Sequence, residues 1–173
     1  MFPEATVLDE LDFALLDAMH EYPRAGALEL SRQLSVARAT VQARLRRLEE
    51  SGVIAGYEPT IGLAAAGFGV QAFVTLEIAQ GDLDSVTIEL ASILGVLEAY
   101  ATTGAGDVLC RIAAASHDGL QATLIELNRS TVVTRSTSVI ALSVIIPLRT
   151  MPLMKTLVPT RDTKAPAFRK TRP

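Results

Sequence analysis

The sequence predicts an α+β fold in two parts, a helical N-terminal part followed by a mixed part of order β-α-β-β-α-β. Three observations predict it. Apolar residues recur at helical spacing through the first fifty residues, they alternate strictly from 68 to 78, and strand and helix periods then take turns. With 173 residues, 49% of them hydrophobic, the chain can form one domain or two small ones and is not mainly disordered.

Composition excludes several kinds of site. The single cysteine, Cys110, rules out an internal disulfide framework and a cysteine-based zinc cluster. Two isolated histidines, His20 and His117, make a histidine-ligated metal site improbable, so we expect no metal and no cofactor. No apolar stretch reaches the roughly 20 residues that span a bilayer, and acidic residues occupy the N-terminus where a signal peptide would be basic. We therefore expect a cytoplasmic protein with no membrane partner.

The first fifty residues predict three helices. The first carries an apolar stripe that leaves its acidic residues mostly to one side, with Asp9 or Thr6 as the candidate N-cap. A second helix is short, and a third runs from about Ala37 to Glu50. The stripe residues of the first two helices are Leu8, Leu11, Leu15 and Met19, then Ala27, Leu30 and Leu34. Two helices joined by a tight turn, with a third ahead of them, form a helix-turn-helix.

The outward face of the third helix predicts contact with double-stranded DNA. Val41, Leu45 and Leu48 define its inward side, at 100° per residue. The opposite side is small at its centre and rimmed by side chains that pair with bases or phosphates. The predicted DNA-binding residues are Arg38, Ala39, Thr40, Gln42, Ala43, Arg44, Arg46 and Arg47, with Arg38 and Arg44 best placed for phosphates. The alternative is an ordinary solvated helix face, but four arginines without one acid between residues 37 and 48, in an otherwise acidic chain, favour DNA.

Domain boundaries follow from glycine, proline and charge. Residues 53–57 are typical of a short extended segment, either a wing or a linker strand, and glycines mark a linker at 58–68. We expect a DNA-binding domain at 1–57 and a second domain at 69–150. Residues 155–173 hold six basic residues and one acid, so 151–173 is interpreted as a flexible basic tail, either a solvated tail or a nucleic-acid-binding arm.

The second half predicts an antiparallel sheet with two helices. Strands are expected at 68–78, 96–103, 108–114 and from Val132 to about Ile146, with helices after Asp82 and from near Ser116. This β-α-β-β-α-β order is the ferredoxin-like motif, which places both helices on one face of the sheet. The other face needs cover, and a second subunit is the expected cover, which makes the protein at least a homodimer.

Several motifs resemble one family. The stretch from Ala39 to Ile54 followed by Gly56-Tyr57, the opening Leu8–Asp12, and the turn Thr103–Asp107 are together similar to the Lrp/AsnC (leucine-responsive, "feast/famine") transcriptional regulators. The resemblance covers residues 8–148. It implies a winged helix-turn-helix, a ferredoxin-like effector and dimerisation domain, assembly to tetramers or octamers, and DNA binding tuned by a small amino acid. The chain departs from the family at Ala37, which cannot cap the third helix.

The candidate effector site combines one turn with the last strand. Gly104 and Gly106 let backbone N–H groups approach a carboxylate, while Asp107 and Thr103 offer partners for an ammonium group. Ser136 and Ser138 share a strand face and match family positions that often hold threonine. The alternative is a hairpin whose glycines serve only its backbone, with Asp107 capping the turn.

The sequence therefore predicts a DNA-binding transcriptional regulator whose DNA binding or assembly responds to an amino acid, and not an enzyme. Two alternatives remain open. Some relatives of this layout resemble sirohaem decarboxylases, but the second half has few histidines and arginines for a tetrapyrrole. An amino-acid sensor that does not bind DNA is the other, and the arginine-rich helix argues against it.

Overall fold

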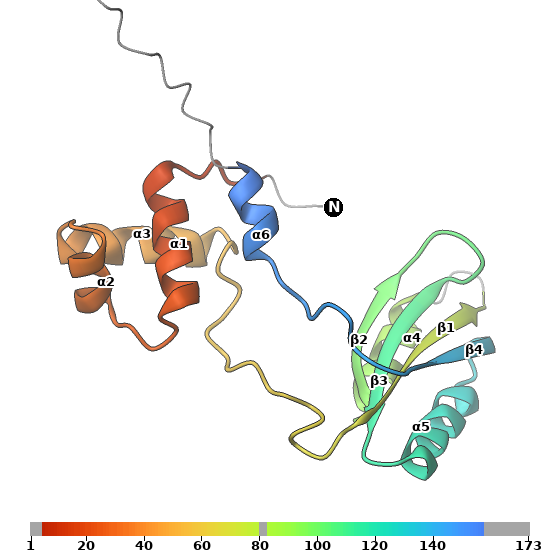
Figure 1. Ribbon diagram of the computed structural model, residues 1–173. Coiled ribbons are helices and arrows are strands. Elements are labelled where there is room, and N and C mark those ends of the chain that lie inside the picture. Colours follow the sequence, from red (N-terminus) through yellow and green to blue (C-terminus); the bar gives the residue numbers. More distant parts are fainter. Residues whose placement is uncertain (1–4, 80–82, 158–173) are drawn as a thin grey trace, which may run out of the picture. The chain divides into compact units, whose positions relative to one another are not determined.

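The computed structural model describes residues 5–79 and 83–157 and divides into two compact units (Figure 1). One unit holds residues 1–58 together with 148–173, and the other holds residues 59–147. The first break falls between residues 58 and 59. The second break differs from the domain end predicted at residue 150, because residues 148–157 belong with the N-terminal unit.

Three helices form the core of the N-terminal unit: α1 (Glu10–Glu21), α2 (Ala27–Gln33) and α3 (Arg38–Glu50). Their inward side chains meet in one core of Leu15, Leu30, Val41 and Leu48, each at most 2% exposed. Burying each such side chain contributes about 1.5–3 kcal/mol to folding. The helical spacing read from the sequence is confirmed, and these helices are the predicted helix-turn-helix.

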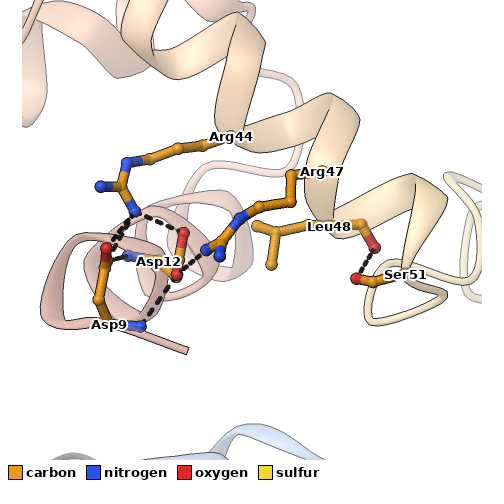
Figure 2. Close-up of polar contacts among 6 residues, drawn as sticks. All are labelled: Asp9, Asp12, Arg44, Arg47, Leu48 and Ser51. Carbon is orange, nitrogen blue, oxygen red and sulfur yellow. Dashed lines mark hydrogen bonds and ion pairs between the residues drawn. The ribbon is translucent and has the colours of Figure 1, made fainter. Parts of the chain in front are cut away.

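The two ends of α3 are defined by backbone conformation and by hydrogen bonds to backbone carbonyls. Ser35, in the turn before it, has a positive φ of 54°, and Ala37 occupies the N-cap without a side-chain hydrogen bond, as expected. At the other end Ser51 Oγ donates to the Leu48 carbonyl over 3.2 Å (Figure 2). Ile54 N donates to the same carbonyl over 3.0 Å. Residues 53–57 form no strand, unlike the extended segment predicted there. Val53 and Ile54 instead pack on the three-helix core.

Residues 151–157 are helical, which corrects the prediction of a flexible tail for this stretch. They form α6 (Met151–Met154) and the 3-10 helix η1 (Lys155–Leu157) within the N-terminal unit. Met151 and Met154, one helical turn apart, are half-buried, and Lys155 Nζ lies 2.8 Å from Asp17 Oδ1 of α1. The basic composition of residues 155–173 indicated neither this helix nor its ion pair with α1. Residues 158–173 lie outside the described residues.

Four strands form the second unit: β1 (Val70–Ile78), β2 (Val96–Ala101), β3 (Val108–Ala114) and β4 (Val133–Ala141). They pair antiparallel in the order β2-β3-β1-β4. Helices α4 (Leu83–Ser92) and α5 (His117–Arg129) complete the predicted β-α-β-β-α-β order. The start of α5 at His117, with Ser116 as its N-cap, confirms the helix predicted from near Ser116. Asp82, after which the other helix is predicted to begin and which is its candidate cap, lies outside the described residues.

One face of the sheet carries the core. Ala72, Val74 and Leu76 of β1 are fully buried, and both helices contribute to the same cluster. Cys110 is fully buried as predicted, and burial raises the pKa of its thiol to about 11. On the opposite face Phe73 is 44% and Val139 65% exposed. The alternation predicted for this strand is therefore confirmed.

Four strand boundaries differ from the prediction. β2 ends at Ala101 instead of residue 103, and β4 begins at Val133 instead of Val132. The other two are the end of β4 and the start of β1. β4 ends at Ala141 instead of near Ile146, because β1, the strand with which it pairs, begins at Val70 and Gln71 of β1 pairs with Ala141. β1 begins at Val70, so Phe68, the first residue of the predicted strand, is not part of it. Among the described residues, none of the helices has the length and apolar character that crossing a membrane requires. The same residues contain no cluster of three or more His, Cys, Asp or Glu side chains suited to a metal ion.

Candidate nucleic-acid interface and effector site

The outward face of α3 is open to solvent within its unit. Seven of the eight predicted DNA-binding residues are exposed, and the eighth, Arg44, is half-buried. Two small residues, Ala39 and Ala43, lie at the centre of this face and line a shallow hollow of about 550 Å³. The exposed residues of the predicted set are Arg38, Ala39, Thr40, Gln42, Ala43, Arg46 and Arg47. Such a surface lets a helix approach the base edges of a major groove closely.

The four arginines of α3 fall into two pairs. Arg44 Nη1 lies 2.7 Å from both carboxylate oxygens of Asp9 and 2.7 Å from Asp12 Oδ1, and Arg47 Nη2 bonds Asp12 Oδ2 (Figure 2). Within the described residues, Arg38 and Arg46 make no hydrogen bond or ion pair. The first pair is held by α1, and the second is free to bind a ligand.

Asp12 is the buried centre of this cluster. Its side chain is 0% exposed, yet both oxygens are satisfied, because Oδ2 also accepts from Asp9 N over 2.9 Å. Asp9 Oδ1 accepts from Asp12 N over 2.9 Å, so the two acids form a capping box at the start of α1. Asp9 is therefore the N-cap that the sequence left open between Asp9 and Thr6.

Hydrogen bonding keeps both carboxylates ionised. The Arg44 guanidinium lowers the pKa of Asp9 below its ordinary value. Burial of Asp12 opposes ionisation, but the hydrogen bonds from Arg47, Asp9 N and Arg44 outweigh it and lower the pKa of Asp12 as well. The pKa of Arg44 is raised, first by its hydrogen bonds to Asp9. The cluster is thus a fully charged network at neutral pH.

The sequence interpretation missed the two acids as part of the site. The helical spacing predicts that the acids of this segment lie mostly off its apolar stripe, but Asp12 is completely buried. A signal existed, because Asp9 and Asp12 are three residues apart, as are Arg44 and Arg47, so each pair lies on one helix face. Nothing in one sequence shows which two faces meet.

The predicted effector turn is a tight connection between β2 and β3. Gly104 has a positive φ of 121°, and Thr102 N donates to the Asp107 carbonyl over 2.8 Å. Gly106 is buried, and a Cβ there would lie 2.2 Å from Thr75 Cγ2 of β1. Both glycines are therefore required by the hairpin itself, which supports the hairpin alternative for them.

Asp107 combines a structural bond with an exposed charge. Its N–H donates to the Leu76 carbonyl over 2.9 Å, and its Oδ2 accepts from Ile78 N over 2.8 Å. The residue remains exposed. Thr103 is also exposed and makes no hydrogen bond within the described residues, while its neighbour Thr102 donates to the Gly106 carbonyl over 2.9 Å. The carboxylate thus caps the end of β1 and still faces solvent.

The two serines lie on the other side of β1. Ser136 pairs with Leu76 and Ser138 with Val74. Ser136 of β4 and Asp107 of the β2–β3 turn therefore lie beside the same residue of β1, on its two sides. Ser136 Oγ donates to Asn128 Oδ1 of α5 over 2.8 Å. The structure therefore brings Asp107 and Ser136 to one end of β1, and Ser138 lies further along the strand.

An apolar pocket of about 310 Å³ opens between α4 and the edge strand β2. Ala101 and Val108, which pair with each other and directly flank the 102–107 turn, lie at its wall. The remaining lining is mostly aliphatic: Leu83, Val86, Thr87, Leu90, Ala91, Val96, Leu97, Glu98 and Ala99. Its volume is at the lower limit for small-molecule pockets.

Comparison with known proteins identifies both units. Residues 8–55 match the family model described as winged helix-turn-helix DNA-binding, and residues 71–160 match the model of the Lrp/AsnC ligand binding domain. The chain belongs to the Lrp/AsnC family. Its resemblance to that family, inferred above from three motifs, is confirmed.

Two relatives of this Lrp/AsnC chain are regulators by name. It is 32% identical to the HTH-type transcriptional regulator AldR of Mycolicibacterium smegmatis over 122 residues, covering 69% of this chain and 71% of AldR. It is 29% identical to the regulatory protein AsnC of Escherichia coli over 123 residues, covering 70% of this chain and 81% of AsnC.

Solved Lrp/AsnC structures share the fold. The structure of E. coli AsnC matches with a TM-score of 0.79 at 26% identity, covering 85% of this chain and 100% of AsnC. A transcriptional regulator of Neisseria meningitidis in complex with L-Met matches with a TM-score of 0.77 at 22% identity, covering 87% of this chain and 99% of that one. The winged helix-turn-helix and ferredoxin-like assignment is therefore established.

Proposed function

We propose that this Lrp/AsnC protein is a sequence-specific transcriptional regulator that binds double-stranded DNA through the outward face of α3. The observation that carries the proposal is that this face is exposed, small at its centre and bears two arginines free of intramolecular partners within the described residues. Arg46 has the geometry for two hydrogen bonds to guanine, and Arg38 lies at the start of the helix, where phosphates pass. Gln42 and Thr40 supply further base or phosphate contacts.

Replacing Arg46 tests this placement. The target duplex is selected from a random-sequence pool with the wild-type protein, and affinities for it and for a scrambled duplex are measured by fluorescence anisotropy. R46A is expected to bind the selected duplex about 5- to 150-fold more weakly and to lose preference at one base position. R24A removes the same charge from the exposed α1–α2 connection and is the matched control. Equal affinities for R46A and R24A would refute the placement.

We further propose that a small amino acid binds at the 102–107 turn and modulates DNA binding or assembly. Asp107 supplies the charge for an ammonium group, backbone N–H groups of the turn supply donors for a carboxylate, and Thr103, Gly104, Gly106, Ser136 and Ser138 complete the candidate site. The adjoining apolar pocket suits an aliphatic side chain. The fold shared with the Neisseria regulator supports this reading, since that protein was solved with L-Met.

A thermal-shift screen of the twenty amino acids tests the effector site. A ligand that binds only the folded state raises the unfolding temperature, by an amount that grows with concentration. D107N keeps an oxygen for Ile78 N but removes the charge, and it is expected to abolish the shift while leaving DNA affinity unchanged. D118N, exposed in the first turn of α5, removes the same charge elsewhere in the unit and should keep the shift. A shift retained by D107N would assign the turn to the hairpin alone.

We also propose that the protein is at least a homodimer through the open face of its sheet, with tetramers or octamers as further assemblies. That face carries exposed Phe73, Tyr100 and Val139 around Arg111. Arg111 bonds Glu98 over 3.1 Å and Gln71 over 2.9 Å, so its charge is already matched within the face. An exposed apolar face with a satisfied polar centre is typical of a subunit interface.

A further inference from the structure

We propose that Asp9 and Asp12, at the start of α1, act as an internal counter-charge to the arginines of α3. In this arrangement Asp9 is a positioning residue that makes DNA affinity depend on base sequence rather than on phosphate charge alone. The inference rests on the DNA binding proposed above. It assigns different roles to the two arginine pairs of α3. Arg38 and Arg46 supply attraction to the duplex, whereas Arg44 and Arg47 are held in place and are largely neutralised.

The charge balance of the cluster supports this assignment. Asp9 and Asp12 together oppose the charges of Arg44 and Arg47 at hydrogen-bond distance. A phosphate that approaches Arg44 therefore meets a guanidinium whose charge is already matched. Attraction to any duplex comes from releasing counterions, about 0.9 for each phosphate that a free cation neutralises. The two carboxylates thus remove part of the attraction to DNA that is independent of base sequence.

The location of Asp9 separates this role from that of a purely structural ion pair. Asp12 is fully buried, but the side chain of Asp9 is 54% exposed and lines the same hollow as Ala39, Thr40 and Ala43. Its carboxylate consequently faces the surface where the duplex binds. A carboxylate there repels phosphates and accepts from base donors such as the cytosine amino group. Asp9 therefore disfavours a duplex that presents only its backbone.

The orientation of Arg44 adds to this selectivity. Arg44 uses Nη1 for all three of its bonds to the carboxylates, and its side chain is 26% exposed. Its Nε and Nη2 donors make no hydrogen bond within the described residues. A guanidinium fixed by one nitrogen presents its other donors in a set direction, so less conformational entropy is lost when it meets a matching acceptor.

The variant D9N tests the counter-charge. Asparagine is as good an N-cap as aspartate, so α1 keeps its start while the charge is lost. The slope of log affinity against log salt is expected to steepen by about 0.9, and affinity for the scrambled duplex to rise about five-fold at 0.15 M salt. Affinity for the selected duplex should change less, so the ratio between the two duplexes falls.

Controls distinguish this from a general charge effect. E50Q removes one negative charge from the exposed end of α3 and should leave the slope and the ratio near wild-type values. A D9N slope equal to that of E50Q would overturn the proposal. If wild-type protein binds neither duplex, the proposed function fails first, and the two failures are thereby distinct.

A second comparison tests the proposal in the wild-type background as well. R46Q is expected to reduce the salt slope by about 0.9, whereas R44Q in the wild-type background should reduce it far less, because that charge is already matched. In the D9N background R44Q should lose the steeper slope again. Equal slopes for R44Q and R46Q in the wild-type background would overturn the proposal even if D9N failed to fold. Far-ultraviolet circular dichroism of each variant verifies the helices.

Discussion

Asp12 is a charged side chain with no exposed surface, and it is stable there because every part of its carboxylate is bonded. Removing one member of a buried ion pair leaves the others without a partner and typically costs about 3–5 kcal/mol. Asp9, only three residues away, is half exposed and caps α1. Two acids on one helical turn thus differ in their effect on stability, because one is buried and the other is half exposed.

The variant D12N should be less stable than the wild type by about 3 kcal/mol at pH 7. Because the folded-state pKa of Asp12 is lowered, its stabilisation is fully present above the unfolded-state pKa of about 4 and is lost as the pH falls through the folded value. The difference between D12N and wild type should therefore shrink as the pH is lowered from 5 to 2. Urea unfolding at each pH measures it. A difference independent of pH would contradict the charged network.

At the scale of elements, the β2–β3 turn is built against β1. Gly106 is the point of closest approach, since a Cβ there would lie 2.2 Å from Thr75 Cγ2 and 3.3 Å from the Leu76 carbonyl. Asp107 bonds the same end of β1 through its N–H and its carboxylate. The turn and β1 therefore behave as one structural element, and a ligand at the turn would be coupled directly to the sheet.

G106A should destabilise the second unit by about 1–3 kcal/mol, because the added methyl group overlaps the Thr75 side chain. T75A removes the nearest atom, so the double variant should recover part of that loss. Thermal unfolding followed by circular dichroism provides the values. Additive losses in the double variant would show that the close approach to Thr75 is not the cause.

At the scale of the whole molecule, the sheet has one covered and one open face. Its helices bury Val74 and Leu76, while Phe73, Tyr100 and Val139 remain exposed on the other side. The proposed assembly would cover that face.

V139E is expected to convert the wild-type oligomer to monomers or to smaller assemblies, because a charge would be buried without a partner at the interface. Size-exclusion chromatography with light scattering gives the mass. I88E is the matched control, since Ile88 is 74% exposed on α4, away from the open sheet face, and its mass should equal that of the wild type. A wild-type monomer at micromolar concentration would contradict the assembly.

Periodicity alone was enough to predict most of the fold. The apolar positions of α1 to α3, the alternation of β1 and the bounds of β3 are local patterns, and each follows from which side chains must leave water. The outward face of α3 follows in the same way, because it is the side opposite Val41 and Leu48. The motifs also placed the chain in its family.

Contacts between distant segments needed the tertiary structure. The pairing of Arg44 with Asp9, the close approach of Gly106 to Thr75 and the end of β4 at Ala141 each join residues far apart in the chain. A periodic pattern shows which face of an element is buried but not which other face it meets. The sequence by itself therefore determined the elements and their apolar sides, and only the folded chain decided which arginines carry free charge.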